Sequence, residues 1–532
     1  MSENGSSNNN KLPRGGGQKE ELSEIFATTW PADITAHLVS FLPLQSLPSF
    51  ASACRAWNDA VARDGHWQVR YLDRWQQPNV KVSSWRTQYK NAHSIDGILY
   101  VCWLLGDPPT APTHLHGSEG QPVEADFYST MSHRLRFTQA TPGACHFLGV
   151  SDDRLYAWGS PHGLRGSGAD GQLYRVSMGI LPRIGDPIST PTVVPSCCDG
   201  PHIHPLDRAG KIKQIHIATY CEQRCAMVTQ CGDFYYFGSR SNLFDECPIP
   251  TSMMSILDLN LQRVRVASVA LGDEHGILVD VVGRVFSFGD NDFGQLGLGN
   301  TDTVDRATLV HSLVEDGVIV VSVAAGKNHS LCLSSAGEVH AFGNNESGQL
   351  GCGRNEDVHN EWDPFELEPT QVLISSSDSV DESVVLSGIM SVSAGLNMSA
   401  FLTSDGALYT CGQSNTGGLG TDPNFNYPQL VNDLASHHVT CISVGGGHMV
   451  ALTADGLCFA WGNNDHGQCG REGSEDDNMR SGEDRGLHDD GRPNGLSVYD
   501  VAQVALPARV RFVCAGDTAT FFILGEPLRE TN

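Results

Sequence analysis

Histidines recur at matching places along this 532-residue chain, and imidazole is the side chain best suited to acid–base chemistry or metal binding near neutral pH. Each follows a short β-prone run and a glycine in the pattern Gly-x-x-His, at His146, His275, His329 and His448. Departing copies of the pattern end at Arg224, Met398 and Ala519. Repetition places each imidazole in a different structural unit, so the four should lie well apart. We therefore predict a structural role, in which each histidine ties its own hairpin to a backbone group.

A second group of residues has side chains that can bind zinc. It comprises His202, His204, His216, Cys221, Cys225 and Cys231. Their spacing fits no standard zinc pattern, and Cys221 occupies a repeat position. The sequence also lacks a nucleophile elbow, an HExxH motif and a Walker sequence. We predict no catalytic residue, no cofactor and no metal site, with zinc at this cluster as the open alternative.

The elements that position these residues belong to a repeat. Its clearest copy reads GRVFSFGDNDFGQLGLG and begins at Gly283, and related copies begin at Gly337, Gly406 and Gly456. Looser copies begin at residues 153 and 232, and a seventh begins at Gly97. A period of about 50–70 residues indicates an array of supersecondary units. Both faces of the predicted strands are apolar, which suits sheets wedged between neighbouring sheets.

The two ends of the repeat region complete each other. Residues 510–524 (VRFVCAGDTATFFIL) form the first half of a repeat, whereas the strand after Asp96 is a second half with no first half before it. One unit built from both ends would close a ring and protect its strand edges. We predict a mainly β protein, a seven-bladed β-propeller over residues 95–525 whose terminal strands pair, with the strand at Ile98–Cys102 against Val510–Leu524.

The composition of the chain argues against some classes of binding partner. The chain has 34 basic and 61 acidic residues, giving −27, which argues against nucleic acid held through phosphate contacts. No apolar run approaches the length of a membrane span. The N-terminus lacks a hydrophobic signal core, which favours the cytoplasm and/or the nucleus, and the 16 cysteines are then expected to be mostly reduced.

Residues before the ring divide into three parts. Residues 1–26 are polar and predicted to be disordered, and residues 76–94 are a linker. Residues 27–75 carry three apolar stripes at helical spacing, a core too thin to stand alone, so they need a partner. Residues 526–532 form a short tail.

The segment Trp30–Ala60 resembles an F-box, through Pro31, Leu42-Pro43, Leu47 and the Cys54-Arg55-x-Trp57 cluster. The resemblance implies docking on the Skp-type adaptor of a cullin-based SCF ubiquitin ligase. The residues that it places against the adaptor are Pro31, Ile34, Leu38, Leu42, Pro43 and Leu47. An ordinary three-helix cap packed on the following domain is the alternative interpretation.

The repeats resemble those of the regulator of chromosome condensation family, which are seven-bladed propellers, through Gly272-x-x-His275, Phe288-Gly289 and the GQLG turns. Three copies contain extra residues, near 167–211, 354–387 and 471–505, each after the GQLG position. Equivalent places in a ring emerge on one side, so we predict that the insertions crowd one face. The last is acidic and offers a candidate substrate-binding set: Glu472, Glu475, Asp476, Asp477 and Asp484.

Together the resemblances imply a non-catalytic substrate receptor of an SCF-type ubiquitin ligase, whose propeller holds an unidentified target protein. The alternative is a guanine-nucleotide exchange factor for a Ran-like small GTPase, which the propeller family also includes.

Overall fold

The computed structural model describes residues 98–102, 123–124, 136–143, 146–151, 154–159, 188–193, 211–218, 224–237, 251–252, 264–353, 364–375, 383–412, 419, 425–464, 466–470 and 497–527. The chain divides into two compact units, Met1–Ile95 and Asp96–Asn532. Every described residue lies in the second unit. The predictions for residues 1–95 therefore fall outside the described part of the chain.

Local sequence makes each repeat an antiparallel hairpin array. In the best-defined repeat, β12 (His275–Asp280) and β13 (Val285–Gly289) are joined by a tight turn at Gly283, whose φ of 89° favours glycine. Every residue of β12 is buried, and so are the first four of β13. Burial on both faces confirms the prediction that each sheet is wedged between two others.

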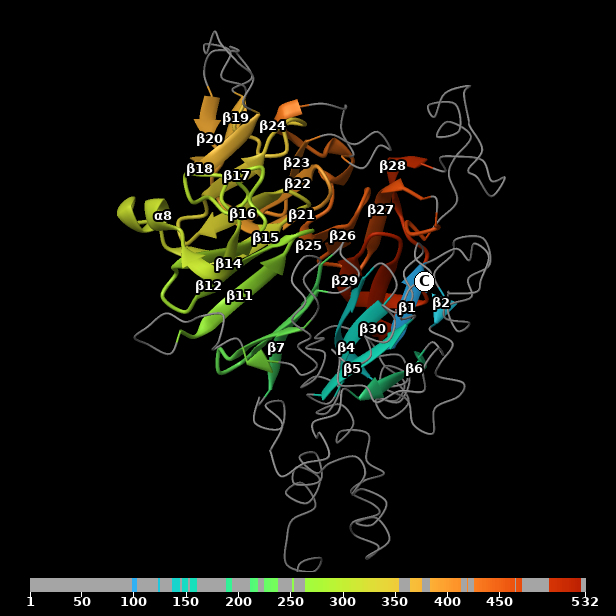
Figure 1. Cartoon of the computed structure of the whole chain (residues 1–532). Coiled ribbons are helices and arrows are strands. Elements are labelled where there is room, and N and C mark those ends of the chain that lie inside the picture. The colour runs from blue at the N-terminus through green and yellow to red at the C-terminus, as the bar shows by residue number, and fades with distance from the viewer. Residues whose placement is uncertain are drawn as a thin grey trace, which may run out of the picture. The chain divides into compact units, whose positions relative to one another are not determined.

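Seven four-stranded antiparallel sheets are present among the described residues, and we number them as blades (Figure 1). Blade 1 contains β3 (Phe137–Pro142), β4 (His146–Ser151), β5 (Arg154–Gly159) and β6 (Ile188–Val193). Blade 2 contains β7 (Ile212–Ile217), β8 (Cys225–Thr229), β9 (Phe234–Phe237) and β10 (Thr251–Ser252). Blade 3 contains β11 (Val266–Leu271), β12, β13 and β14 (Val304–Leu309). Blade 4 contains β15 (Val320–Ala325), β16 (His329–Ser334), β17 (Val339–Asn344) and β18 (Phe365–Gln371).

The remaining blades follow the same order. Blade 5 contains β21 (Ile389–Ala394), β22 (Met398–Thr403), β23 (Leu408–Gly412) and β24 (Phe425–Leu430). Blade 6 contains β25 (Val439–Val444), β26 (His448–Thr453), β27 (Cys458–Asn463) and β28 (Ser497–Gln503). Blade 7 contains β29 (Ala508–Ala515), β30 (Thr520–Pro527), β1 (Leu99–Cys102) and β2 (Val123–Glu124). The first strands of successive blades contact one another, and β29 contacts β3, so these inner strands form a closed circle.

Blade 7 closes the ring as predicted. Its sheet order is β2-β1-β30-β29, so a strand from each end of the repeat region lies at the centre of one sheet (Figure 1). Leu99 pairs with Ile523, and Cys102 pairs with Thr520. Each end supplies two strands, and neither pair alone would complete a blade.

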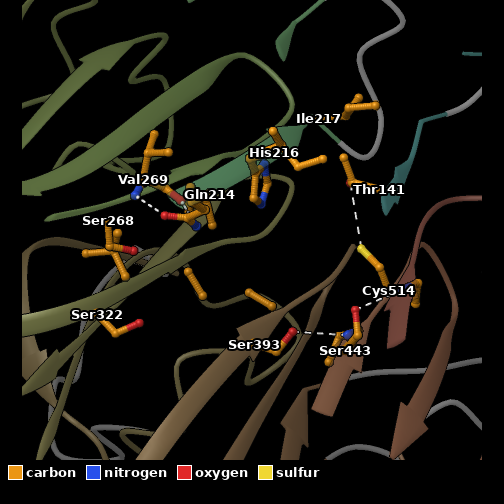
Figure 2. Close-up of a pocket in the computed structure, with 18 of the residues that line it drawn as sticks. Thr141, Gln214, His216, Ile217, Ser268, Val269, Ser322, Ser393, Ser443 and Cys514 are labelled. Atoms are coloured by element: carbon orange, nitrogen blue, oxygen red, sulfur yellow. Dashed lines mark hydrogen bonds between the residues drawn. The ribbon is translucent and has the colours of Figure 1, made fainter. Parts of the chain in front are cut away.

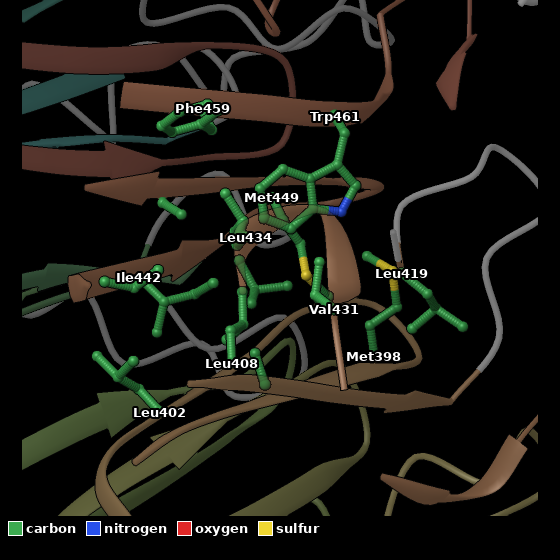
Figure 3. Close-up of a cluster of buried hydrophobic side chains, with 14 residues drawn as sticks. Met398, Leu402, Leu408, Leu419, Val431, Leu434, Ile442, Met449, Phe459 and Trp461 are labelled. Atoms are coloured by element: carbon green, nitrogen blue, oxygen red, sulfur yellow. The ribbon is translucent and has the colours of Figure 1, made fainter. Parts of the chain in front are cut away.

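The core lies between blades rather than inside any one of them. Figure 3 shows the interface of blades 5 and 6, where Trp461 and Met449 of blade 6 pack against Met398 and Leu408 of blade 5. Trp461 is fully buried. A blade removed from the ring would expose an apolar face on each side, and the repeats therefore stabilise one another.

Connections between blades carry three short additions in the described part of the chain. A helix, α8 (His311–Glu315), links blades 3 and 4, and a 3-10 helix, η5 (Asn432–Leu434), links blades 5 and 6. A hairpin of β19 (Leu373–Ser375) and β20 (Ser383–Val385) links blades 4 and 5. This hairpin belongs to the 354–387 insertion and contacts the GQLG turn, because the Leu373 amide donates to the Gly351 carbonyl at 3.0 Å. The other two insertions lie mostly outside the described residues, so the clustering of all three on one face stays a prediction. None of the described helices has the length and apolarity needed to span a membrane.

Candidate functional site

The residues chosen from the sequence as contact sites all lie outside the described part of the chain. These are the adaptor set (Pro31, Ile34, Leu38, Leu42, Pro43 and Leu47) and the acidic substrate set (Glu472, Glu475, Asp476, Asp477 and Asp484). Both sets remain predictions. The described residues instead define three features of the ring. These are the histidine contacts between blades, the cavity along the axis of the ring, which we call the channel, and the two ends of that channel.

Recurring histidines join neighbouring blades. His275 Nε2 lies 3.0 Å from the Ser330 hydroxyl of the next blade, and His329 Nε2 lies 3.0 Å from the Ser399 hydroxyl. His448 Nε2 lies 2.7 Å from the Thr520 hydroxyl. For these three histidines the predicted structural role is supported, but the prediction did not foresee that Nε2 faces a side-chain hydroxyl of the next blade. Its partner is a side chain across the blade interface, which a reading of one repeat at a time does not reveal.

The hydroxyl of each pair has a second bond that fixes the direction of the first. Ser330 Oγ donates to the carbonyl of Gln295, at 2.8 Å, and Ser399 Oγ donates to that of Gln349, at 2.6 Å. A hydroxyl has one hydrogen, so it must accept from the imidazole, which is therefore the Nε2–H form. The carbonyl belongs to the GQLG turn of the histidine's own blade. One hydroxyl thus connects two segments of the preceding blade, and we call this arrangement the histidine clamp.

Burial keeps these imidazoles neutral. It lowers the pKa of His329 to about 4, and with neighbouring positive charge it lowers the pKa of His275 to about 3. It also lowers the pKa of His448 to about 3. Their Nδ1 atoms are buried without a hydrogen-bond partner. That of His275 packs so closely on Gly272 that a Cβ there would approach it to 2.4 Å. The imidazoles are structural groups with no room for a metal ion or a substrate.

Two departures from the Gly-x-x-His pattern are matched across the interface. We call the residue in the place of His275 the clamp position. Blade 5 has Met398 there, and the next blade has Met449 where blade 4 has Ser330, so the interface becomes apolar on both sides. Blade 7 has Ala519, and blade 1 offers the large Phe147, with both side chains buried. At these two interfaces the pairs are apolar on both sides, so neither leaves a polar partner without a bond. The third departure, Arg224, is not matched in this way, because its buried Nε has no hydrogen-bond partner.

Glycines at the ends of the inner strands allow the blades to approach closely. A Cβ on Gly326 would come within 2.5 Å of the Gly395 carbonyl, and one on Gly395 within 2.4 Å of the Gly445 carbonyl. By contrast, the glycines of GQLG have φ between +66° and +76° in blades 3 and 4, as their interpretation as positive-φ turns requires. Asn291 fills that turn by accepting a bond from the Leu296 amide, at 2.9 Å, so the turn is not a phosphate cradle.

A cavity of about 240 Å³ lies along the axis of the ring and is lined by the seven inner strands (Figure 2). Its wall is mostly small and polar, with hydroxyls from Ser268, Ser322, Ser393 and Ser443. Several of these groups bond to the next inner strand. Ser393 Oγ accepts from the Val444 amide, at 3.0 Å, and Ser443 Oγ accepts from the Ala515 amide, at 2.9 Å. The channel wall therefore holds the ring together as well as enclosing space.

His216 belongs to this wall, and its position settles part of the zinc question. It lines the channel from β7, where burial lowers its pKa to about 4, whereas Cys225 on β8 lies in the apolar core between blades 1 and 2 (Figure 2). Cys231 is exposed in the turn after β8. His202, His204 and Cys221 lie outside the described residues. The described members of the cluster do not converge, and no group of three metal-ligating residues occurs in the described part of the chain.

At the end of the channel formed by the Gly-x-x-His turns, two carboxyl groups come near each other. Burial raises the pKa of Asp517, and the charge of Asp273 adds to that effect. Burial likewise raises the pKa of Asp273, while Lys327 and Arg224 oppose the rise. Mixed charge at this end can bind a polar group, and the residues described there include no nucleophile paired with a base.

The repeats match a known family over blades 3 to 6. The regulator of chromosome condensation (RCC1) repeat matches residues 282–333, 336–402 and 405–452, and a second form of the same repeat matches 266–295, 320–349 and 439–468. The chain carries RCC1 repeats. They cover the blades with the clearest copies of the sequence pattern.

Relatives of the RCC1-repeat region occur in proteins of different architecture. The E3 ubiquitin-protein ligase HERC2 of Homo sapiens is 30% identical over 297 residues, which are 47% of this chain and 6% of HERC2. The ultraviolet-B receptor UVR8 of Arabidopsis thaliana is 31% identical over 245 residues, 45% of this chain and 49% of the receptor. The chain thus spans at most about half of either relative.

Solved structures confirm the propeller. Human WBSCR16 superposes with a TM-score of 0.58 at 17% identity, covering 81% of this chain and 99% of that protein. Prp20p of Saccharomyces cerevisiae, described together with its binding to Gsp1p and histones, gives a TM-score of 0.57 at 17% identity, over 83% of this chain and 95% of Prp20p. The protein is a seven-bladed RCC1-like β-propeller, and at this identity the likeness concerns the fold alone.

Proposed function

We propose that this chain is the substrate-recognition subunit of an SCF-type ubiquitin ligase. Its F-box-like segment, Trp30–Ala60, docks on the Skp-type adaptor and through it on a cullin, and the RCC1-repeat propeller holds a target protein. The observation that supports the proposal is the combination of this motif with a closed ring that offers surfaces but no catalytic constellation among its described residues. The subunit would work in the cytoplasm and/or the nucleus, without a cofactor.

The physical role of such a subunit is to raise local concentration. A target bound to the propeller and a ligase core bound to the F-box meet as parts of one complex, so ubiquitin transfer no longer depends on chance encounter. A ring whose terminal strands pair is well suited to this task because its surfaces stay fixed relative to one another. HERC2, a ubiquitin ligase that carries similar repeats, is consistent with the proposal, although this chain spans only 6% of it.

Co-purification with the Skp-type adaptor tests the proposal directly. We expect full-length chain to retain the adaptor, and Leu42→Asp or Leu47→Asp to reduce the retained amount at least about tenfold, because a carboxylate in an apolar contact is left unpaired. Leu12→Asp, in the predicted N-terminal tail, is the matched control and should have no effect. Equal retention by Leu42→Asp and Leu12→Asp would overturn the F-box assignment.

The alternative is a guanine-nucleotide exchange factor for a Ran-like GTPase, which rests on the family resemblance alone. Release of bound nucleotide from such a GTPase, measured with and without the full chain, distinguishes the two. Acceleration at catalytic amounts of the chain, together with no adaptor binding, would favour the exchange factor.

A further inference from the structure

All seven inner strands contain a β-bulge at the same place. In each blade, the register of pairing between the inner strand and the strand after it shifts near the start of the inner strand. In blade 4 the shift lies between Val320 and Ser322, and in blade 5 it lies between Ile389 and Ser391. A bulge leaves one residue outside the ladder and re-aims its side chain. The seven bulged residues are Thr138, Lys213, Ala267, Val321, Met390, Thr440 and Arg511, and we call this circle the bulge rim.

The bulge rim surrounds the end of the channel opposite the Gly-x-x-His turns, because the bulge begins each inner strand and the turn ends it. Six residues along a strand separate the two ends by about 20 Å. The ring places Arg511, Thr138 and Lys213 in consecutive blades. Val321 and Met390 follow farther round, also in consecutive blades, and are 50% and 51% exposed. One arc of the rim is therefore cationic and another is apolar.

The cationic arc keeps its charge beside the channel. Lys213 Nζ donates to the Ala267 carbonyl of the next inner strand, at 2.6 Å, and Arg511 donates to the Phe137 carbonyl. The acceptor of Lys213 is neutral, so that bond fixes where the ammonium group lies without cancelling its charge. Arg265 is exposed just before β11 and extends the arc. Its neighbour Asp280 is already committed to Arg284, at 2.7 Å.

The apolar arc also extends outward. Ile319 packs on the turn of the preceding blade so closely that a Cβ on Gly283 would lie 2.5 Å from its Cγ2. Val281 and Val282 form that turn, and all three side chains are more than half exposed. The Val281 amide donates to the Arg265 carbonyl, at 2.9 Å, so the apolar arc begins where the cationic one ends. A continuous apolar surface beside fixed cations is typical of a binding site.

We propose that the bulge rim and its extensions bind an acidic protein segment that carries apolar side chains. Charge complementarity supports this occupant, because a chain with a net charge of −27 has gathered cations here next to exposed valine, isoleucine and methionine. The same net charge opposes approach to an anionic membrane, the other surface that such a patch could suit. The proposal rests on the receptor function proposed above and assigns the face that holds the target.

Fluorescence anisotropy with the full chain tests the assignment. The probe is a labelled synthetic peptide in which glutamates alternate with leucines, and two control peptides replace the glutamates by lysines or the leucines by serines. We expect saturable binding of the first peptide only. Lys213→Glu and Met390→Glu should each weaken binding about tenfold, as loss of a central contact does. Lys213→Arg should restore it.

Lys327→Glu is the matched control, because it makes the same charge change at the opposite end of the channel. Binding of that variant should stay within about twofold of the wild-type value. Equal weakening by Lys213→Glu and Lys327→Glu would show an effect of net charge and overturn the site, as would failure of the acidic peptide to bind. Binding of phosphatidylserine vesicles, but not of the peptide, would overturn the choice of partner. Leu42→Asp should leave peptide binding unchanged, so failure of the F-box assignment and failure of this site are distinguishable.

Discussion

The histidine clamp makes a quantitative prediction at Ser399. Its hydroxyl accepts from His329 Nε2 at 3.0 Å and donates to the Gln349 carbonyl at 2.6 Å, and neither His329 nor Ser399 has any exposed side-chain surface. Replacing Ser399 by Ala removes one oxygen and leaves almost no void. It does leave the buried N–H of His329 without a partner, at a cost of about 1–3 kcal/mol, and it leaves the Gln349 carbonyl only the weak Cys411 thiol donor, at 3.6 Å. We expect Ser399→Ala to lower the free energy of unfolding by about 1–4 kcal/mol.

Urea unfolding of the full chain, followed by tryptophan fluorescence, measures this loss. Trp461 is buried at the adjoining interface of blades 5 and 6 and should report the transition. Ser404→Ala, an exposed position in the same blade, is the matched control and should change stability by less than about 0.5 kcal/mol. Ser399→Thr, which reproduces the residue of blade 7, should retain most of the stability. If Ser399→Ala unfolds at the same urea concentration as Ser404→Ala, the clamp does not hold the blades together and our account of the ring is wrong.

Two other predictions concern protonation and close approach. Burial lowers the pKa of His275, His329 and His448 to between about 3 and 4, below the value of about 6.5 in an unfolded chain, so their contribution is fully present above pH 6.5 and is lost as the pH falls toward 4. At pH 5 each histidine should lower the free energy of unfolding by about 2 kcal/mol. The double variant His329→Met/Ser399→Met, which copies the native Met398–Met449 pair, should remove about that amount from the loss of stability measured by urea unfolding between pH 7.5 and 5. An unchanged pH dependence would exclude His329 as a cause. Gly395→Ala should lower the free energy of unfolding by at least about 1–3 kcal/mol, because its Cβ would lie 2.4 Å from the Gly445 carbonyl. Gly388→Asn is the control and should change stability by less than about 1 kcal/mol. Nothing lies within 4 Å of the added Cβ, and asparagine tolerates the φ of 73° at that position. Similar thermal unfolding of these two variants would show that the inner turns are less tightly packed than their geometry requires.

Much of the ring could be predicted because its determinants are local and repeated. Gly283 and its equivalents set the turns, and the apolar residues on both strand faces indicate a sheet covered on two sides. The unmatched halves at Asp96 and Val510 predicted closure, which the pairing of Leu99 with Ile523 confirms. These features need only a comparison of the chain with itself.

What the sequence did not reveal depends on which repeats become neighbours. His329 bonds to Ser399, 70 residues away, and only the closed ring brings them together. The substitution of Met398 was visible as a departure, but its match at Met449 becomes meaningful only across an interface. The hairpin at 373–385 was missed because surplus length does not say whether the extra residues pair as strands. The bulges also gave no signal, since a bulged valine and a paired valine read alike.

The contrast between the clamp and the bulge rim is evidence about function. Each is one position of the repeat that occurs seven times around the ring, so the residues at each position have similar backbone surroundings in every blade. At the clamp, the change to Met398 in blade 5 is matched by Met449 in blade 6, and such matching avoids an unpaired buried polar group, which would destabilise the fold. At the rim, Lys213, Val321 and Met390 differ with no such match, and solvent would accept threonine at each, as it does at Thr138 and Thr440. Packing within the ring therefore does not explain why cations gather on one arc and apolar groups on another, whereas a partner with acidic and apolar groups does.

Replacing Lys213, Val321 and Met390 together by threonine should then leave the urea midpoint of the full chain nearly unchanged, apart from the loss of the single bond of Lys213 to Ala267. The same variant should no longer bind the glutamate–leucine peptide. A large loss of stability in that variant would mean that the rim is part of the packing after all.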